Sequence, residues 1–522
     1  MIGALPPSPP ALVSISVTNG STPFAGDGRL LTTVSPNSDG FRDRAIVHFR
    51  LTAAARVRMD AVRTDTIRTG RNAAQVVWST KKELGAGPQL LVWKPARSTP
   101  PRTYILRLTV TDAHGGKRVY SNPGPSGPVK APVVRVQGID SGFLRLSYAP
   151  GETADVSIAT DARSLKLQVF SYGNELNPTE RDLRSGGEAM TTPVQLDWTA
   201  HRNAPATVRF VRAGDWPSGL YFLRLTAVDG RVGYAPFVVR PPILGATARV
   251  AVVLSTNTWQ AYNFRDSDGD GWGDSWYVSS AVHAVDTTRP FLDFGVPFRF
   301  GDWDLTFIAW VAQTAKRVEF LTDSDLDSLA NGDALARAYD LVIFPGHEEY
   351  ATQHEYDVVQ RYRDLGGNLM FLSANNFFCK VTRHGIQLVR VKLWRNLRRP
   401  EAALVGVQYA GSNHGELQLP YTVVGTDAAP WAFGGTGLAN GSTFGRYGIE
   451  IDARAPSSPA GTTVLARVPD ILGSGRSAEM TYYETPAGAK VFAAGTLDFA
   501  ASLDNPVVSK LVDNLWTHLS SP

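Results

Sequence analysis

Residues 340–350 read Asp-Leu-Val-Ile-Phe-Pro-Gly-His-Glu-Glu-Tyr, and this stretch decides the fold of the C-terminal half. Its first part, Leu341–Phe344, is an uninterrupted apolar run, which is typical of a strand buried on both faces of a sheet. Similar runs occur at residues 249–254, 368–372 and 491–494. Polar residues follow directly, as expected where a parallel strand ends in a ligand-binding loop. The stretch therefore predicts a parallel sheet with polar loops at its carboxyl edge.

Helical patterns lie between these apolar runs. Residues 353–365 have a helical pattern, and Gly366-Gly367 after them is a frequent signal for the C-terminal end of a helix. Asn505-Pro506 begins a last amphipathic helix. Alternating strands and helices predict an α/β doubly wound parallel-sheet domain over residues 246–520. The segment of about residues 380–490 is Gly-rich and β-like, which predicts a β-rich insertion into this domain.

Toward the N-terminus the chain changes to short alternating segments separated by Gly, Pro, Asn and Asp, a pattern typical of all-β sandwiches. The pattern of Trp93 followed by the strand-like segment Tyr104–Asp112 is repeated by Trp198 followed by Tyr221–Asp229. The repeat predicts two sandwiches, at residues 12–125 and 133–240, joined by a Pro- and Gly-rich linker. Both copies resemble the bacterial Ig-like domains found in cell-surface proteins.

Composition limits the partners and the location. The chain has 52 Lys and Arg against 48 Asp and Glu, a net charge of +4, and no basic block that predicts a nucleic-acid partner. No apolar stretch approaches the ~18–20 residues that span a bilayer. Met1–Ala11 lacks the features of an export signal. Because the N-terminal domains resemble those of cell-surface proteins, we nevertheless expect an extracellular or cell-surface protein whose signal is not in this sequence; a cytoplasmic location is the second reading.

The single cysteine, Cys379, excludes an intramolecular disulfide. It follows two phenylalanines at the end of an apolar run. We therefore expect it to be a small buried apolar residue and not a nucleophile.

Four loops that follow the predicted strands are rich in polar and aromatic residues, namely residues 256–263, 345–350, 373–376 and 495–498. Because the carboxyl ends of parallel strands meet at one edge of a sheet, these loops should converge on one crevice. His347 with Glu349 could act there as an acid–base pair. The candidate catalytic residues are His347, Glu349, Tyr350, Tyr262 and Asn375.

The same loops carry a family resemblance. Five ordered blocks, at residues 259–263, 322–326, 345–350, 366–375 and 404–409, resemble the C-terminal domain of the N,N-dimethylformamidase large subunit. The resemblance implies a fold like the class I glutamine amidotransferases, and hydrolysis of a small amide at an iron ion held by two tyrosines and a glutamate. Tyr350 matches one tyrosine. The position of the second tyrosine ligand corresponds to Asp304-Leu305, and the position of the glutamate ligand lies near Val389 or Glu401. The resemblance therefore implies the cleft more strongly than the iron.

Residues 266–271 read Asp-Ser-Asp-Gly-Asp-Gly. Carboxylates at positions 1, 3 and 5 with Gly at position 6 suit a hard cation such as calcium. The candidate ligands are Asp266, Asp268, Asp270 and Asp274. Position 12, normally a bidentate Glu, is Tyr277. Calcium affinity should therefore be weaker, or residues elsewhere in the chain should complete the coordination.

Two functional readings follow. The first is an exported amidohydrolase that acts on a C–N bond of a small-molecule or surface-polymer substrate, with a small partner subunit or a homo-oligomer as its candidate assembly. The second is a non-catalytic surface protein that binds a glycan or peptide through Trp259, Trp272 and Trp276. Because scaffolds of this kind carry many chemistries, the site itself has to decide between them.

Overall fold

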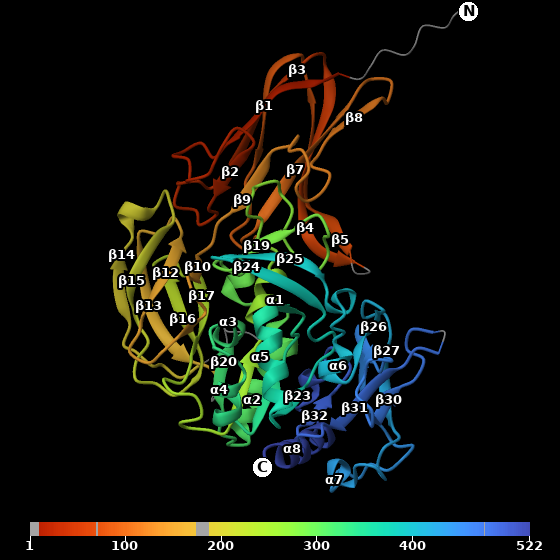
Figure 1. Ribbon diagram of the computed structural model, residues 1–522. Helices are drawn as coiled ribbons and strands as arrows, with labels where there is room; N and C mark the ends of the chain where they lie inside the picture. Colours follow the sequence, from red (N-terminus) through yellow and green to blue (C-terminus); the bar gives the residue numbers. More distant parts are fainter. Residues whose placement is uncertain (1–9, 69–70, 174–186, 474, 522) are drawn as a thin grey trace, which may run out of the picture.

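The computed structural model describes residues 10–68, 71–173, 187–473 and 475–521. The chain is mostly β-sheet, with several sheets and short helices arranged in more than one domain. Figure 1 shows the red and orange N-terminal unit at the top, a second unit in orange and yellow at the left, and the green-to-blue C-terminal region below them.

The N-terminal unit consists of two sheets that share one apolar core. One sheet is formed by β1 (Leu12–Thr18), β3 (Ala45–Leu51) and β6 (Gly87–Trp93). The other has the order β2 (Leu31–Val34), β9 (Val133–Val136), β7 (Thr103–Thr111), β4 (Ala55–Arg68) and β5 (Arg71–Leu84), with β8 (Lys117–Tyr120) paired to β7.

Strand β9 lies in the range that the sequence assigned to the second sandwich, yet it pairs with β2 and β7 of the first unit. The Pro- and Gly-rich segment before it is therefore a loop of the first unit and not the link to the second. That loop is held by Asn122, whose side-chain oxygen accepts from the backbone N–H groups of Lys130 and Ala131 at 2.8 and 2.9 Å.

The second unit also has two sheets around a core of its own. The first contains β10 (Asp140–Phe143), β12 (Thr153–Ala159) and β15 (Ala206–Arg212). The second has the order β11 (Ser147–Tyr148), β17 (Val232–Val239), β16 (Gly219–Ala227), β13 (Ser164–Ser171) and β14 (Val194–Asp197), and a 3₁₀ turn at Thr199–His201 follows it.

The sequence repeat corresponds to a repeated structural feature. The Tyr104 hydroxyl donates to the carbonyl of Pro100 at 3.0 Å, and the Tyr221 hydroxyl donates to the carbonyl of Pro217 at 2.8 Å. Each tyrosine thus binds the backbone four residues upstream, which fixes the chain where it enters the strand. Trp93 and Trp198 are both buried in their cores.

The C-terminal region is built on a nine-stranded sheet. Its first five strands are parallel and carry the apolar runs of the sequence: β20 (Glu319–Thr322), β18 (Val250–Leu254), β21 (Leu341–Phe344), β23 (Asn368–Phe371) and β32 (Lys490–Ala493). The antiparallel strands β31 (Ala478–Glu484), β30 (Thr463–Val468), β27 (Gln418–Val423) and β28 (Thr443–Gly448) follow. The segment predicted as an insertion therefore extends the sheet.

Alternate residues of β18 pack on opposite sides of this sheet. Val250, Val252 and Leu254 join the core formed with α2 (Thr306–Gln313) and α8 (Pro506–Leu519). Ala251 and Val253 join the core formed with α3 (Asp323–Asp327), α4 (Asp333–Ala338) and α5 (Gln353–Asp364). The predicted start of α8 is confirmed, because Asn505 accepts from Val507 N at 2.9 Å and Pro506 is the first helical residue.

Two small sheets and several short helices complete the region. One sheet has the order β19 (Ala284–Asp286), β25 (Gln387–Leu393), β24 (Cys379–His384) and β22 (Tyr350–Thr352), and lies between the N-terminal unit and the large sheet (Figure 1). The other pairs β26 (Gln408–Ser412) with β29 (Glu450–Ala453). The short helices are α1 (Thr256–Ala261), α6 (Ala402–Val405), α7 (Pro430–Phe433), Asp293–Gly295, Gly301–Leu305, Trp394–Leu397 and Ala500–Ser502.

The second unit and the C-terminal region share a continuous core. Tyr172, Phe222 and Tyr234 from the second unit belong to the same buried cluster as Phe300 and Ile308. In the described part of the chain, no helix is long and apolar enough to cross a membrane.

Candidate functional site

The site lies where β18 and β21 end at the carboxyl edge of the large sheet. Tyr262 follows α1, the short helix that leaves β18, and His347, Glu349 and Tyr350 follow β21. The backbone N–H of Glu349 donates to the Thr258 hydroxyl at 3.2 Å, which ties the two loops together. The predicted residues therefore meet, as parallel strand topology requires.

His347 is at the centre of the group and only 1% exposed. Its Nδ1 lies 3.0 Å from the carbonyl oxygen of Ala374, so Nδ1 is the protonated nitrogen of the neutral ring. Its Nε2 lies 3.3 Å from the Tyr262 hydroxyl and 3.3 Å from a Glu349 oxygen. The nitrogen that can exchange a proton thus points at a phenol and a carboxylate.

Glu349 connects the two tyrosines. The Tyr262 hydroxyl donates to Glu349 Oε2, and the ring centroids of Tyr262 and Tyr350 are 5.9 Å apart. Burial raises the pKa of both phenols well above the usual value, and the charge of Glu349 raises each pKa further. Two phenols and one carboxylate therefore come together in a place where only a cation could ionise the phenols near neutral pH.

Asn375 brings a further acid into the group. Its side-chain amide donates to Glu450 Oε2 at 2.9 Å, and this oxygen lies 3.6 Å from His347 Nε2. The Asn375 backbone N–H donates to both oxygens of Asp452, at 2.8 and 2.9 Å. Asn375 has a left-handed backbone with φ 58°, which asparagine tolerates better than most residues. The predicted Asn375 is thus the link between the strand-end loops and β29.

Burial sets the protonation of these groups. Burial raises the pKa of Glu450 to about 7, with His347 opposing the shift and Glu349 adding to it. Burial alone would lower the pKa of His347, but the hydrogen bond to Glu349 and the charge of Glu450 raise it above the usual value. An acid whose pKa is near neutrality beside a histidine is a pair that can transfer a proton.

Sequence reasoning missed Glu450 and Asp452. They alternate with Ile449 and Ile451, so both acids lie on one face of a strand that is otherwise apolar. That alternation is the signal that could have found them. The alternation alone could not identify them, because the sequence around β29 does not show that this strand contacts Asn375, more than 70 residues earlier.

The residues at the other two ligand positions that the resemblance implies have partners of their own. Glu401 does not join the group, because its carboxylate is paired with Arg395 through Nε at 2.9 Å. Val389 pairs with Ala284 and Thr382 in the β19–β25–β24 sheet. Asp304, at the position of the second tyrosine, accepts from Trp259 Nε1 at 3.0 Å, and burial raises its pKa to about 7.

The tryptophans of the glycan- or peptide-binding reading are not arranged for surface binding. Trp259 and Trp276 are buried, and the Trp276 ring packs on Tyr350 with centroids 4.9 Å apart. Trp272 donates through Nε1 to the carbonyl of Asn122 at 3.0 Å. Cys379 is buried as expected, and burial raises its thiol pKa to about 12.

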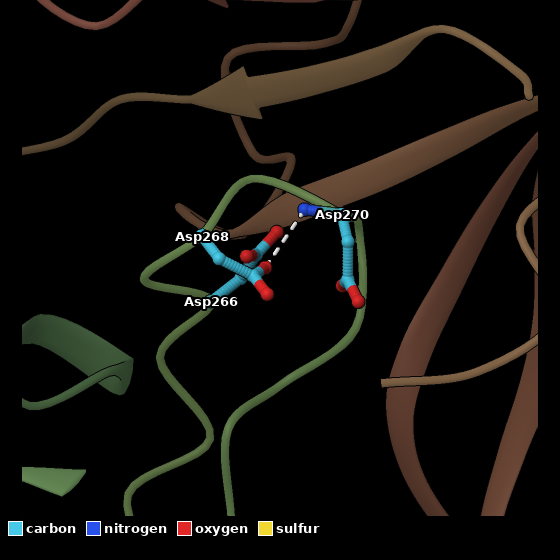
Figure 2. A group of neighbouring side chains, drawn as sticks. All are labelled: Asp266, Asp268 and Asp270. Atoms are coloured by element: carbon cyan, nitrogen blue, oxygen red, sulfur yellow. Dashed lines mark hydrogen bonds between the residues drawn. The ribbon is translucent and has the colours of Figure 1, made fainter. Parts of the chain in front are cut away.

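The acidic loop lies apart from this site and packs on the N-terminal unit. One oxygen from each of Asp266, Asp268 and Asp270 lies within 4.8 Å of the others, and Figure 2 shows the three side chains on one tight turn. Asp274 is not in that group; it accepts from Ser267 N at 2.8 Å. Burial raises the pKa of Asp266 to about 7, to which Asp270 contributes.

Two contacts hold this loop against the first unit. Asn122 Nδ2 donates to the Asp270 carbonyl at 2.7 Å, and Ser126 N donates to the Asp270 carboxylate at 2.7 Å. Gly271 has φ 89°, and a Cβ there would lie 2.4 Å from Ile105. The glycine is therefore needed both for the turn and for the close approach.

Comparison with known proteins gives consistent matches. The chain is 28% identical over 204 residues to the N,N-dimethylformamidase beta subunit of Paracoccus aminophilus, a match that covers 32% of this chain and 26% of that protein. It is 27% identical over 188 residues to the N,N-dimethylformamidase beta subunit of Alcaligenes sp, covering 29% and 24%. The matched part spans about a quarter of the length of these relatives.

A solved structure, native alpha-2-macroglobulin from Escherichia coli, is 12% identical and covers 38% of this chain and 67% of that one, with a TM-score of 0.14 that carries no argument. The family described as "N,N-dimethylformamidase beta subunit-like, C-terminal" matches residues 180–513. The matched residues include the strand-end group, namely Tyr262, His347, Glu349, Tyr350, Asn375 and Glu450. Because this match spans well over half of the chain, the protein belongs to the N,N-dimethylformamidase beta subunit-like family.

Proposed function

We propose that this protein hydrolyses the C–N bond of a small amide at the group formed by Tyr262, His347, Glu349, Tyr350 and Glu450. The observation that carries the proposal is the position of His347 Nε2, which lies within 3.6 Å of a phenol and two carboxylates in a buried site. Such a cluster is costly to bury unless its members bind one another or an ion, and the family supplies the reaction class.

The chemistry follows from the contacts of His347. Amide hydrolysis needs a base that takes a proton from water and an acid that returns it to the leaving nitrogen. The Ala374 carbonyl holds Nδ1, which leaves Nε2 to accept the proton of water and pass it on. Glu349 and Glu450 stabilise the imidazolium that forms between these steps. Asn375 positions Glu450 through its amide.

The donor set also fits the metal that the family resemblance implies. Tyr262, Tyr350 and Glu349 provide two phenols and a carboxylate, and Tyr262 comes from a loop different from the one indicated by the resemblance. A cation bound by these three residues would supply Lewis-acid activation of the amide or of water. The residues themselves exclude solvent, since Tyr262 and Tyr350 are each 3% exposed. That closure favours a small substrate.

The rest of the molecule fits a supporting role. We propose that the C-terminal region is a doubly wound α/β domain of the glutamine amidotransferase type, because five parallel strands have helices on both faces. The two N-terminal units then act as Ig-like spacers of an exported protein. The relatives are named as beta subunits, and we therefore propose that this chain works with a partner subunit.

We also propose a structural calcium ion in the loop of Asp266, Asp268 and Asp270. The support is that the three carboxylates lie close together and that Asp266 and Asp270 are almost fully buried. A calcium ion would neutralise them and hold the loop on the N-terminal unit.

Amine or ammonia release from formamide, N,N-dimethylformamide and acetamide tests the proposed function. We expect the full chain to hydrolyse at least one of them, and His347→Ala to slow this about 10²–10⁴-fold, the usual contribution of a general acid–base group. His384→Ala, which removes an exposed histidine at the end of β24, is the matched control and should leave the rate unchanged. Equal rates for wild type and His347→Ala would refute the proposal.

A further inference from the structure

A second group of buried acids lies beside the strand-end site. Asp323 is the first residue of α3 after β20, Glu348 follows β21, and Glu355 is in the first turn of α5. All three are fully buried at 0% exposure. One oxygen of each lies within 4.8 Å of an oxygen of the other two.

The hydrogen bonds inside the protein leave much of this group unsatisfied. Asp323 accepts from the Thr256 hydroxyl at 3.0 Å and from the Asn257 backbone. Glu355 accepts from Thr352 N at 3.3 Å and from Asn257 Nδ2 at 3.4 Å. Four oxygens are buried without a hydrogen-bond partner: Asp323 Oδ1, Glu348 Oε1, Glu348 Oε2 and Glu355 Oε1. The nearby Ser255 hydroxyl is also buried and unpartnered.

Basic side chains compensate the three acids only from a distance, because the charge of Arg383 acts on Asp323 without a direct ion pair. Among the described residues, no Lys, Arg or His nitrogen lies within 4.0 Å of any of them. Arg383 instead donates to Asn257 Oδ1 at 2.7 Å and pairs with Asp327 at 3.6 Å. Buried carboxylates of this kind need protons or a bound cation.

We propose that Asp323, Glu348 and Glu355 bind a divalent, oxygen-preferring cation of the Ca²⁺ or Mn²⁺ type. Ligands at about 2.4 Å from one ion lie at most about 4.8 Å apart, and one oxygen of each carboxylate lies within 4.8 Å of the other two. A shared proton satisfies one pair of oxygens, whereas three carboxylates whose oxygens lie this close together suit an ion. The hydroxyls of Ser255 and Thr256 are candidates for completing the coordination.

The surroundings support a role for this group. A cavity of about 370 Å³, lined in part by Thr256, Asn257 and Arg383, lies next to Asp323. Glu348 stands between His347 and Glu349 in the chain, so a cation that fixes Glu348 also fixes the loop carrying the strand-end site. This position differs from the proposed phenol-containing site, because its donors are carboxylates and hydroxyls only.

Manganese binding to the full chain tests the proposal. The parent for the test carries Asp268→Asn and Asp270→Asn, which remove the acidic loop as a competing site. After chelation, Mn²⁺ is titrated and the free ion is followed by electron paramagnetic resonance. We expect Glu355→Gln to bind one equivalent fewer than this parent, whereas Glu416→Gln, on the surface, binds the same number.

An unchanged number of equivalents in Glu355→Gln would overturn the proposal and leave protons as the neutralising species. Should that variant fail to fold, Asp323→Asn provides the same comparison. A crystal of the parent soaked in Mn²⁺ decides the question without substituting any of the three acids. An anomalous peak between the three carboxylates is expected, and a crystal without that peak would contradict the site.

Discussion

At the scale of the residue, the site depends on small features that place polar atoms with little freedom. Gly346 precedes His347, and a Cβ at this position would lie 2.4 Å from Asp304 Oδ1 and 3.2 Å from the Ser255 hydroxyl. Asp304 is held by Trp259, so it cannot move away without breaking that hydrogen bond. Glycine is therefore the residue that lets the loop after β21 approach the loop after β18.

Substitution of Gly346 by alanine tests this packing. We expect Gly346→Ala to lower the free energy of unfolding by about 1–3 kcal/mol, the usual cost of overpacking a buried position. Gly85→Ala is the matched control, because a Cβ there has nothing within 4 Å, and it should change stability little. Equal denaturation midpoints for the two variants would show that Asp304 can give way.

At the scale of the element, sequence patterns predicted the parallel strands because each is a local apolar run, and predicted His347, Glu349, Tyr350 and Tyr262 because strand ends converge by topology. The sequence did not predict Glu450 as a site residue, because its position beside His347 depends on the pairing of β29 with β26. The pairing of β9 with the first unit escaped prediction for the same reason. Long-range pairing leaves no local signal in one sequence.

Glu319, at the start of β20, gives a test of element-level stability. Its carboxylate accepts from Gly245 N, Thr247 N and the Thr247 hydroxyl, each at 2.8 Å, and from Tyr339. Burial would raise the pKa of Glu319, but these hydrogen bonds lower it below the usual value. A glutamine would turn an N–H group toward backbone donors, so we expect Glu319→Gln to cost about 1–3 kcal/mol at pH 7.

The pH dependence has a definite sign. Because the folded pKa of Glu319 is lowered, its stabilisation is present above the usual glutamate pKa and is lost as the pH falls through the lowered value. The difference in melting temperature between wild type and Glu319→Gln should therefore shrink between pH 6 and pH 3. A difference that is independent of pH would assign the effect to packing alone. Glu416→Gln, at an exposed position, should match wild type throughout.

At the scale of the whole molecule, the C-terminal region is attached to both N-terminal units. The second unit contributes Tyr172, Phe222 and Tyr234 to the largest core. The first unit holds the acidic loop through Asn122 and Ser126. The proposed reaction centre thus sits on a scaffold whose parts are packed together, which favours the pre-formed geometry that acid–base chemistry needs.

Calcium tests the attachment to the first unit. We expect calcium to raise the melting temperature of the full chain, because an ion that binds only the folded state stabilises it by mass action. Asp268→Asn with Asp270→Asn should bind one calcium equivalent fewer by calorimetry and lose most of that rise. The control is Asp39→Asn with Asp43→Asn, in a second acidic turn whose carboxylates accept backbone N–H groups. A full calcium response in the first pair of substitutions would discard the loop as the site.

The central claim is that Tyr262, Glu349 and Tyr350 belong to a functional centre and are not a self-satisfied structural network. The metal content of the purified full chain, compared with that of a Tyr262→Phe, Tyr350→Phe variant of equal folded fraction, tests it most directly. The account predicts about one transition-metal ion per wild-type chain, lost in the double variant and kept in Tyr120→Phe, which removes a distant phenol of the first unit. Metal absent from the wild type, or retained in the double variant, would contradict the claim.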